Sequence, residues 1–324
     1  MNAKAFICGV KGHYLSALEH EFLLREQPYG VILFARNCDN PAQVKTLCAE
    51  IMNCLKHPFA SILIDQEGGR VARLRPPHWR KYPPAAHFKC ANEVKLNARV
   101  IAEELASVGI TTNCAPLADV PIADAHDIIG DRAFGTTPEQ VTRLARAQAD
   151  GLMEGGILPI LKHIPGHGRA RADSHEELPV VDVSLEVLEA SDFVPFRALR
   201  DIPLGMTAHI LYTALDAKTV ATQSKKVIDY IRTKIGFDGL LMSDDLSMKA
   251  LTGTYAERTK ATFAAGCDLA LHCNGDMAQM RDVAAQSLEL AGDALRRAQR
   301  AKSMMPLART LSEAELKDWA KSVA

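Results

Sequence analysis

Short runs of apolar residues alternate along the chain with longer segments in which apolar residues recur every three or four positions. Eight of the runs have the length and composition of buried β-strands. They lie at residues 4–10, 30–34, 61–65, 111–116, 157–163, 203–209, 239–244 and 268–273. Segments with helical spacing lie between them, at 41–56, 93–109, 138–156, 186–200, 224–237 and 254–266, and several end at a glycine, which is a common helix terminus.

Strands that alternate with helices in this number are typical of a (β/α)8 TIM barrel, an α/β fold. The alternative is a doubly wound open sheet, which usually has a G-x-G-x-x-G loop after its first strand. Here the first strand is followed by GVKGHYL, which does not match. Because no repeat, low-complexity tract or Pro/Gly/Ser-rich linker divides the chain, we predict a single catalytic domain over 1–324 with a C-terminal helical tail.

Composition narrows the classes of partner. Of the 324 residues, 48% are hydrophobic, and 38 Lys and Arg are balanced by 39 Asp and Glu, for a net charge of -1. This balance lacks the excess of positive charge that is typical of proteins that bind nucleic acid or an anionic membrane. No apolar run approaches the ~18 residues of a membrane span, and the N-terminal run is too short for a signal peptide. We therefore expect a cytoplasmic protein that acts on a small molecule, with no nucleic-acid or membrane partner.

The eight cysteines are scattered without a C-x-x-C pair, and several lie inside apolar runs such as AFICGV and TNCAPL. This pattern favours buried, reduced thiols over disulfides. A structural zinc site would normally need closely spaced pairs of ligands.

Polar residues that end the apolar runs are candidates for chemistry, because TIM-barrel sites lie at the C-terminal ends of the strands. These candidates are Asp65, Asp119, Lys162 with His163, His209, Asp244 with Asp245, and Asn274. The connections after the third, fourth and fifth strands have roughly 20 residues each, against the usual two to six. We expect these long connections to be binding loops over a pocket.

The segment GLLMSDDLSMKA brings two adjacent carboxylates to a strand end. Successive strand side chains point to opposite faces, so one of Asp244 and Asp245 should face the pocket. The other should cap the short helix suggested by LSMKAL. Taken alone, the pair also fits ordinary caps and salt bridges.

The segment KHIPGHGRARADSHEELP places Asp173 two residues before His175. At this spacing the aspartate can accept the Nδ1 proton of the histidine and leave Nε2 facing a substrate. An imidazole with a pKa near ~6.5 can donate and recover a proton near neutral pH. The three histidines of the segment are alternatively a metal cluster or solvated loop residues, although the Pro-Gly pair between the first two excludes a helical two-histidine motif.

The segment ILIDQEGGRVARLR offers Asp65 and Arg73 around a Gly-Gly turn. An aspartate at a strand end can accept two sugar hydroxyl protons, and an arginine fork can hold further oxygens. A plain turn with a salt bridge is the alternative.

Together, KHIPGHG followed by DSH, DQEGGRVARLR, GDRAFG, MTAHI and SDDLSM resemble, in order and over most of the chain, the catalytic barrel of family 3 glycoside hydrolases. The most similar branch is that of single-domain bacterial β-N-acetylglucosaminidases of cell-wall recycling. The resemblance implies a retaining double displacement with Asp244 as nucleophile and His175 as acid/base, oriented by Asp173. The family's sugar-binding residues correspond to Asp65, Arg73, Arg132, Lys162 and His163.

The resemblance also implies the substrate, terminal N-acetylglucosamine on muropeptides of the GlcNAc-1,6-anhydroMurNAc type, and a monomer without metal or cofactor. The chain departs from the family at Arg169-Ala170-Arg171, where an acidic residue usually follows GHG, and this difference bears on the leaving group. The alternatives are a metal-dependent barrel hydrolase that uses the loop histidines, and a sugar-binding protein without catalysis. A histidine base, unlike a carboxylate, does not repel an anion. A further hypothesis is therefore that phosphate replaces water as the acceptor in the second step.

Overall fold

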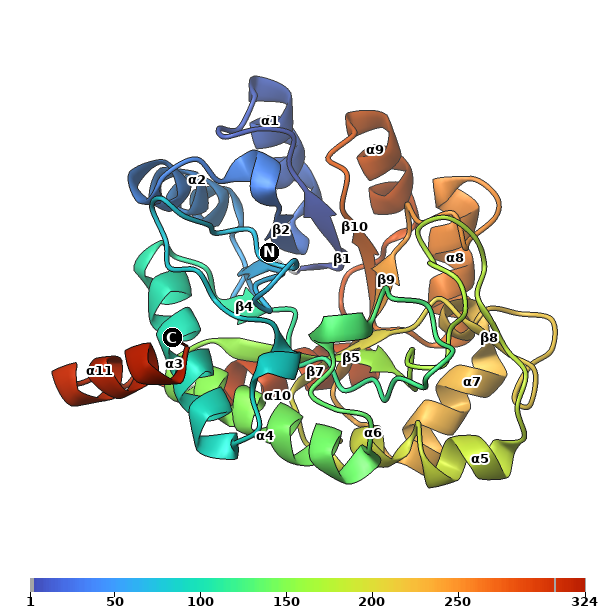
Figure 1. Ribbon diagram of the computed structural model, residues 1–324. Helices are drawn as coiled ribbons and strands as arrows, with labels where there is room; N and C mark the ends of the chain where they lie inside the picture. The colour runs from blue at the N-terminus through green and yellow to red at the C-terminus, as the bar shows by residue number, and fades with distance from the viewer. Residues whose placement is uncertain (1–2, 306, 324) are drawn as a thin grey trace.

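A closed barrel of parallel strands forms the centre of the computed structural model, which describes residues 3–305 and 307–323 (Figure 1). Within these residues its strands are β1 (Lys4–Gly9), β2 (Pro28–Leu33), β3 (Ser61–Ile64), β4 (Thr112–Asn113), β5 (Leu158–Ile164), β7 (Leu204–Thr207), β9 (Leu240–Asp245) and β10 (Leu269–His272). They are ordered β1-β10-β9-β7-β5-β4-β3-β2, and β1 closes the ring because it pairs with both β2 and β10. Each predicted apolar run overlaps one of these strands, so the single-domain (β/α)8 prediction is confirmed.

Helices surround the barrel (Figure 1). They are α1 (Ala17–Glu26), α2 (Pro41–Cys54), α3 (Ala91–Ser107), α4 (Pro138–Glu154), α5 (Leu185–Ala190), α6 (Val194–Ala198), α7 (Lys225–Tyr230), α8 (Tyr255–Ala265), α9 (Met277–Gln286), α10 (Gly292–Ser303) and α11 (Glu313–Ser322). Short 3-10 turns lie at Ala35–Asn37, Ala85–His87, Gly130–Arg132 and Ala221–Gln223. Local sequence explains where several helices begin. At the start of α2 the Asn40 side chain accepts a hydrogen bond from the Gln43 amide, and Pro41 occupies the first helical position, which proline favours.

Two predicted helices differ from the structure. The segment 186–200 forms the two short helices α5 and α6 rather than one. Pro195 explains the break, because a proline inside a helix clashes with the carbonyl four residues earlier and has no N–H to donate. The segment 224–237 forms α7 and then a π-helical turn, Ile231–Ile235. A small parallel pair outside the barrel, β6 (Val180–Val181) with β8 (Leu211–Tyr212), was not predicted from the sequence.

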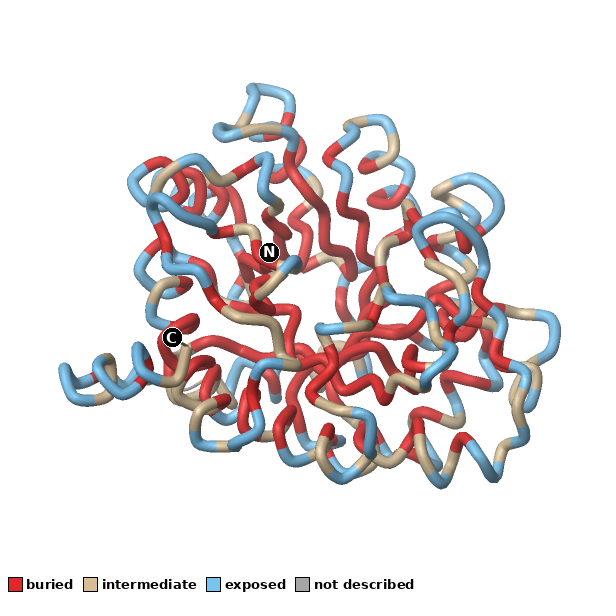
Figure 2. Tube along the Cα trace, in the orientation of Figure 1, coloured by how far each residue is buried: buried red, intermediate tan, exposed pale blue. Residues whose placement is uncertain are grey.

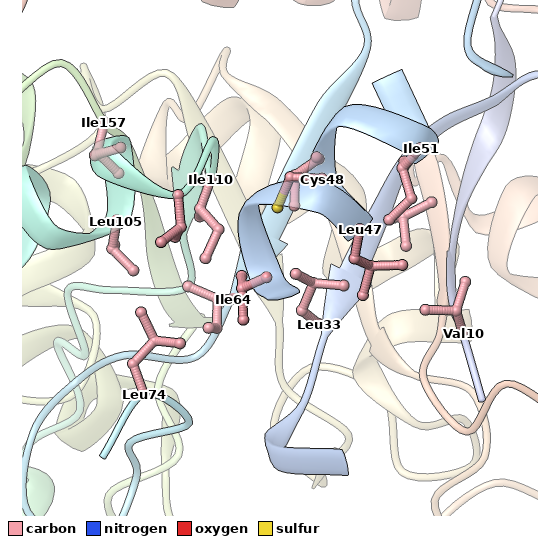
Figure 3. Close-up of a cluster of buried hydrophobic side chains, with 14 of the residues drawn as sticks. Val10, Leu33, Leu47, Cys48, Ile51, Ile64, Leu74, Leu105, Ile110 and Ile157 are labelled. Atoms are coloured by element: carbon pink, nitrogen blue, oxygen red, sulfur yellow. The ribbon is translucent and has the colours of Figure 1, made fainter. Parts of the chain in front are cut away.

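The core lies on both sides of the barrel wall, and Figure 2 shows the strands buried while helices and loops carry the exposed positions. Leu33 and Ile64 pack outward in one cluster with Leu47 of α2 (Figure 3). Their neighbours Ile32 and Leu63 belong to a second cluster, because alternate strand side chains point to opposite faces. Because close-packed interiors have low compressibility, this wall can hold the side chains at the strand ends in fixed positions.

The long loops after β3, β4 and β5 cover the C-terminal end of the barrel. They comprise residues 65–90, 114–137 and 165–184. Arg70 of the first loop forms an ion pair with Asp127 of the second at 3.1 Å. The amide of His126 in the second loop donates to the carbonyl of Ala170 in the third at 2.8 Å. These contacts join the three loops into one wall over the barrel mouth.

The eight cysteines all have free thiols, as predicted, and most of them are buried. Among the described helices, none has the length and apolar character that crossing a bilayer would require.

Candidate active site

A cavity of about 180 Å³ opens among the C-terminal ends of the barrel strands. Its polar lining consists of Asp65, Arg73, Arg132, Lys162, His163, His167, Ser174, His175, Asp244 and Asp245, and its apolar lining includes Phe34, Val71, Ile129, Met206 and Met248. Every predicted catalytic or sugar-binding residue except Asp173 lines it. Of the other strand-end candidates Asp245 lines the cavity, whereas Asp119, His209 and Asn274 do not.

Asp65, directly after β3, lies between two cations. One carboxylate oxygen accepts a hydrogen bond from Nζ of Lys162 at 3.1 Å, and the other accepts one from Nη2 of Arg73 at 3.0 Å. Burial opposes the ionisation of Asp65, but the charges of Lys162 and Arg73 outweigh burial and lower its pKa. Asp65 is therefore a carboxylate at neutral pH and can only accept hydrogen bonds.

Glu67 extends this network, although the sequence did not predict it as a site residue. Its carboxylate accepts hydrogen bonds from Nε and Nη2 of Arg132 at 2.9 and 2.8 Å, and its Oε1 lies 2.6 Å from Nζ of Lys162. Burial opposes ionisation, but the charges of Arg132 and Lys162 bring the pKa of Glu67 to about 2. We call Asp65, Glu67, Arg73, Arg132 and Lys162 the charged cage. The sequence feature that could have identified Glu67 as a site residue is its position two residues after Asp65, in the same arginine-rich segment.

Asp119 holds two histidines at the cavity. Its Oδ2 lies 2.8 Å from Nδ1 of His163, and its Oδ1 accepts a hydrogen bond from the backbone amide of His167 at 2.7 Å. Burial opposes the ionisation of Asp119, but His163 lowers its pKa, so Nδ1 of His163 carries the proton and Nε2 remains for a ligand. Burial and the neighbouring His163 lower the pKa of His167 to about 4, which leaves it neutral at pH 7. The sequence placed Asp119 at a strand end and His167 in the loop, but it assigned neither to substrate binding.

Asp244 and Asp245 end β9. Asp244 is buried, and its Oδ1 accepts a hydrogen bond from the amide of Asp245 at 2.8 Å. Burial opposes its ionisation, but nearby histidines, His163 foremost, lower the pKa of Asp244. The Asp245 carboxylate accepts hydrogen bonds from the amides of Ser247 at 3.0 Å and Cys273 at 3.1 Å, so it caps the segment that follows. That segment, residues 246–251, forms a turn and not the predicted short helix. The prediction that only one of the pair faces the cavity was wrong, because the pairing of β9 with β10 shifts register between Met242 and Asp245, which interrupts the regular alternation of side chains.

Asp173 and His175 form a dyad in the loop after β5. Oδ1 of Asp173 accepts a hydrogen bond from the His175 amide at 2.9 Å and lies 2.7 Å from Nδ1 of its ring. Partial burial opposes the ionisation of Asp173, but the hydrogen bonds from His175 lower its pKa. Because this contact occupies Nδ1, Nε2 is the nitrogen that can exchange a proton with a ligand.

Arg169, where the chain departs from the family pattern, lies at the base of the same loop. Its Nε is 2.6 Å from Oδ2 of Asp192, which is buried. Arg171 is exposed, and neither arginine lines the cavity. The arginine at position 169 therefore anchors the loop and does not contact the cavity.

The loop histidines do not form a metal cluster among the described residues. The rings of His163 and His167 are T-shaped with centroids 5.4 Å apart, and His175 is bound to Asp173. Within 3–305 and 307–323, no group of three or more His, Cys, Asp or Glu side chains is placed to hold a metal ion.

Comparisons with known proteins cover most of the chain. Residues 10–304 match the glycosyl hydrolase family 3 N terminal domain. The β-hexosaminidase of Methylococcus capsulatus is 40% identical over 272 residues, which are 81% of this chain and 80% of that protein.

Solved structures of NagZ from Neisseria gonorrhoeae have the same fold. One, in complex with zinc ion, has a TM-score of 0.86 at 28% identity and covers 100% of this chain and 99% of that one. Another, in complex with N-trifluoroacetyl-D-glucosamine, has a TM-score of 0.82 at 30% identity and covers 100% of this chain and 98% of that one. By the extent of these matches, the chain belongs to glycoside hydrolase family 3 and is a β-hexosaminidase of that family.

Proposed function

We propose that this β-hexosaminidase is a retaining exo-β-N-acetylglucosaminidase in which Asp244 is the nucleophile and His175 is the acid/base catalyst, oriented by Asp173. One observation carries the proposal: a buried, ionised carboxylate and an imidazole bound through Nδ1 to a second carboxylate share one cavity. Cleavage of a glycoside passes through an oxocarbenium-like state, which needs a carboxylate beneath the anomeric carbon and a proton donor at the leaving oxygen.

The reaction takes two displacements. In the first, an Asp244 oxygen bonds to the anomeric carbon while the bond to the leaving oxygen breaks, and Nε2 of His175 gives its proton to that oxygen. In the second, His175 takes a proton from water, whose oxygen displaces Asp244 and restores the original anomeric configuration. Asp173 stabilises the imidazolium form and keeps the ring oriented.

The sugar-binding role falls to four members of the charged cage and to His163. Asp65 accepts hydrogen bonds from hydroxyl groups, while Arg73, Arg132 and Lys162 donate to sugar oxygens. Since each cage charge already has a partner in the protein, the groups are oriented before the sugar arrives. The cavity of about 180 Å³ is smaller than the ~300–1,000 Å³ usual for drug-sized ligands, which supports a single terminal sugar and exo action.

The natural substrate that we propose is the terminal N-acetylglucosamine of muropeptides of the GlcNAc-1,6-anhydroMurNAc type, cleaved in the cytoplasm during peptidoglycan recycling. The bound N-trifluoroacetyl-D-glucosamine of the Neisseria gonorrhoeae protein supports the sugar. The free thiols are consistent with a reducing compartment. A monomer without cofactor suffices, since one chain supplies the whole proposed site.

Hydrolysis of a chromogenic N-acetylglucosaminide, measured with and without a chelator, tests the proposal. We expect equal turnover in both, with the β-anomer as the first product in NMR spectra. Turnover lost to the chelator and restored by zinc would instead support a metal-dependent hydrolase, which the zinc complex of the Neisseria gonorrhoeae relative makes worth testing. Sugar binding without turnover would support a protein that binds and does not cleave.

A further inference from the structure

The turn at residues 246–251, here called the nucleophile turn, continues directly from β9 and is held firmly. The Asp245 carboxylate accepts a hydrogen bond from the Ser247 amide at 3.0 Å. Nη1 of Arg258 in α8 donates to the carbonyl of Leu246 at 2.7 Å. Leu246 is also fully buried. The turn therefore has a defined position relative to β9 and to the proposed nucleophile on it.

The tip of the loop after β5 rests on this turn through Ser174. Of residues 171–178, all of which the structure describes, Ser174 alone is buried. Its carbonyl accepts a hydrogen bond from the amide of Ala250 at 3.2 Å. Its hydroxyl donates to the sulfur of Met248, a weak acceptor, at 3.7 Å. Main chain and side chain of one buried residue thus both bind the nucleophile turn.

Ser174 lies between the two members of the dyad, which are joined to it in one short turn. The amides of Glu176 and Glu177 donate to the carbonyl of Asp173 at 2.9 and 3.0 Å, and the amide of His175 donates to its carboxylate at 2.9 Å. A displacement of Ser174 would therefore carry Asp173 and His175 with it. The side chain of His175 is itself 57% exposed, so its neighbours in the chain must hold it in place.

We propose that Ser174 is a positioning residue: seated on Met248 and Ala250, it sets the height of His175 above Asp244. The inference rests on the proposed function, because it takes His175 as the acid and Asp244 as the nucleophile. Both groups must reach one glycosidic bond, and a misplacement of about 1 Å can cost about 10²-fold in rate. Contact with the nucleophile turn ties the height of the acid to the strand that carries the nucleophile.

Two other roles for Ser174 predict different kinetics. Ser174 lines the cavity, and a direct contact with the sugar would slow all substrates that share that sugar by the same factor. A purely structural role would lower the melting temperature without changing how the rate depends on the leaving group. A misplaced acid slows chiefly the substrates whose leaving group needs a proton.

The experiment measures kcat/KM over aryl N-acetylglucosaminides of graded phenol pKa, with the melting temperature of each variant as a check on folding. Ser174→Ala should lose about tenfold with the poorest leaving groups and little with the most activated, less than the about 10²–10⁴-fold expected for His175→Ala. Met248→Leu, which removes the sulfur acceptor, should also make the rate depend more steeply on the leaving group. Ser174→Thr, which keeps the hydroxyl, should show the same dependence as wild type. Lys249→Ala is the matched control, because its ion pair with Glu176 at 2.8 Å spans the same gap but is exposed and should contribute little.

A Ser174→Ala dependence parallel to wild type, beside a steeper one for His175→Ala, would overturn the inference and leave the proposed function standing. A His175→Ala dependence no steeper than wild type would remove the proposed acid, and the inference with it. An effect of Lys249→Ala as large as that of Ser174→Ala would overturn the buried anchor in favour of the ion pair.

Discussion

Replacement of Glu67 by glutamine removes one negative charge from the charged cage and keeps the size of the side chain. In the native protein Glu67 is 8% exposed and contacts Arg132 at 2.9 and 2.8 Å and Lys162 at 2.6 Å. All the contacting groups are donors, so an amide NH₂ in place of a carboxylate oxygen would face N–H groups. A buried ion pair that loses one partner costs about 3–5 kcal/mol.

The lowered pKa of Glu67 corresponds to a similar contribution of these ion pairs to the folding free energy. A fall in this pKa from 4.5 to about 2 corresponds, at about 1.4 kcal/mol per tenfold change in the ionisation constant, to about 3 kcal/mol of folding free energy at neutral pH. Because the folded-state pKa is below the unfolded one, this stabilisation is complete above about pH 4.5 and is lost as the pH falls toward about 2. For 324 residues the unfolding entropy is about 0.7 kcal/mol/K, so Glu67→Gln should lower the melting temperature by about 4–5 °C at pH 7.

Urea unfolding of wild type and Glu67→Gln at pH 7 and at lower pH checks this prediction. The difference in unfolding free energy should be about 3 kcal/mol at pH 7 and should shrink below about pH 4. The control is Glu21→Gln, whose side chain is 71% exposed and lies 3.9 Å from Arg25, and it should stay within about 0.5 kcal/mol of wild type. A Glu67→Gln variant as stable as wild type at pH 7 would refute the ionised cage.

Other variants test the roles assigned to single residues. Asp244→Ala should abolish turnover, while Asp245→Ala should mainly lose a cap, at about 1 kcal/mol in urea unfolding; the reverse pattern would move the nucleophile to Asp245. His175→Ala should slow substrates with poor leaving groups by about 10²–10⁴-fold, and Asp173→Asn should act in the same direction because an amide cannot stabilise the imidazolium; equal slowing of activated aryl substrates would contradict the acid role. His167→Gln should lower kcat/KM without moving its pH profile above about pH 5, since the pKa of His167 is about 4; a shifted profile would show that its charge takes part.

Much of the framework could be predicted from local pattern. Buried parallel strands are short apolar runs, so their positions are visible in the sequence, although the boundary of β2, predicted at 30, lies at Pro28. The rule that TIM-barrel chemistry follows the strand ends leads to Asp65, Lys162 and Asp244, all of which line the cavity. The dyad could also be recognised, because Asp173 and His175 are neighbours in the chain and bind each other locally.

By itself, the sequence determined what depends on neighbours in the chain: the strands, most of the predicted helices, the cap at Asp245 and the contact between Asp173 and His175. The tertiary structure alone decided which distant side chains meet. Glu67 binds Arg132 across 65 positions, Asp119 binds His163 across 44, and Ser174 rests on Met248 across 74. The hydrophobic periodicity of the sequence holds no information on such pairs, because they come into contact only when the barrel closes and the three long loops pack together. The same holds for the ionisation of Glu67 and His167, because burial and neighbouring charge exist only after folding.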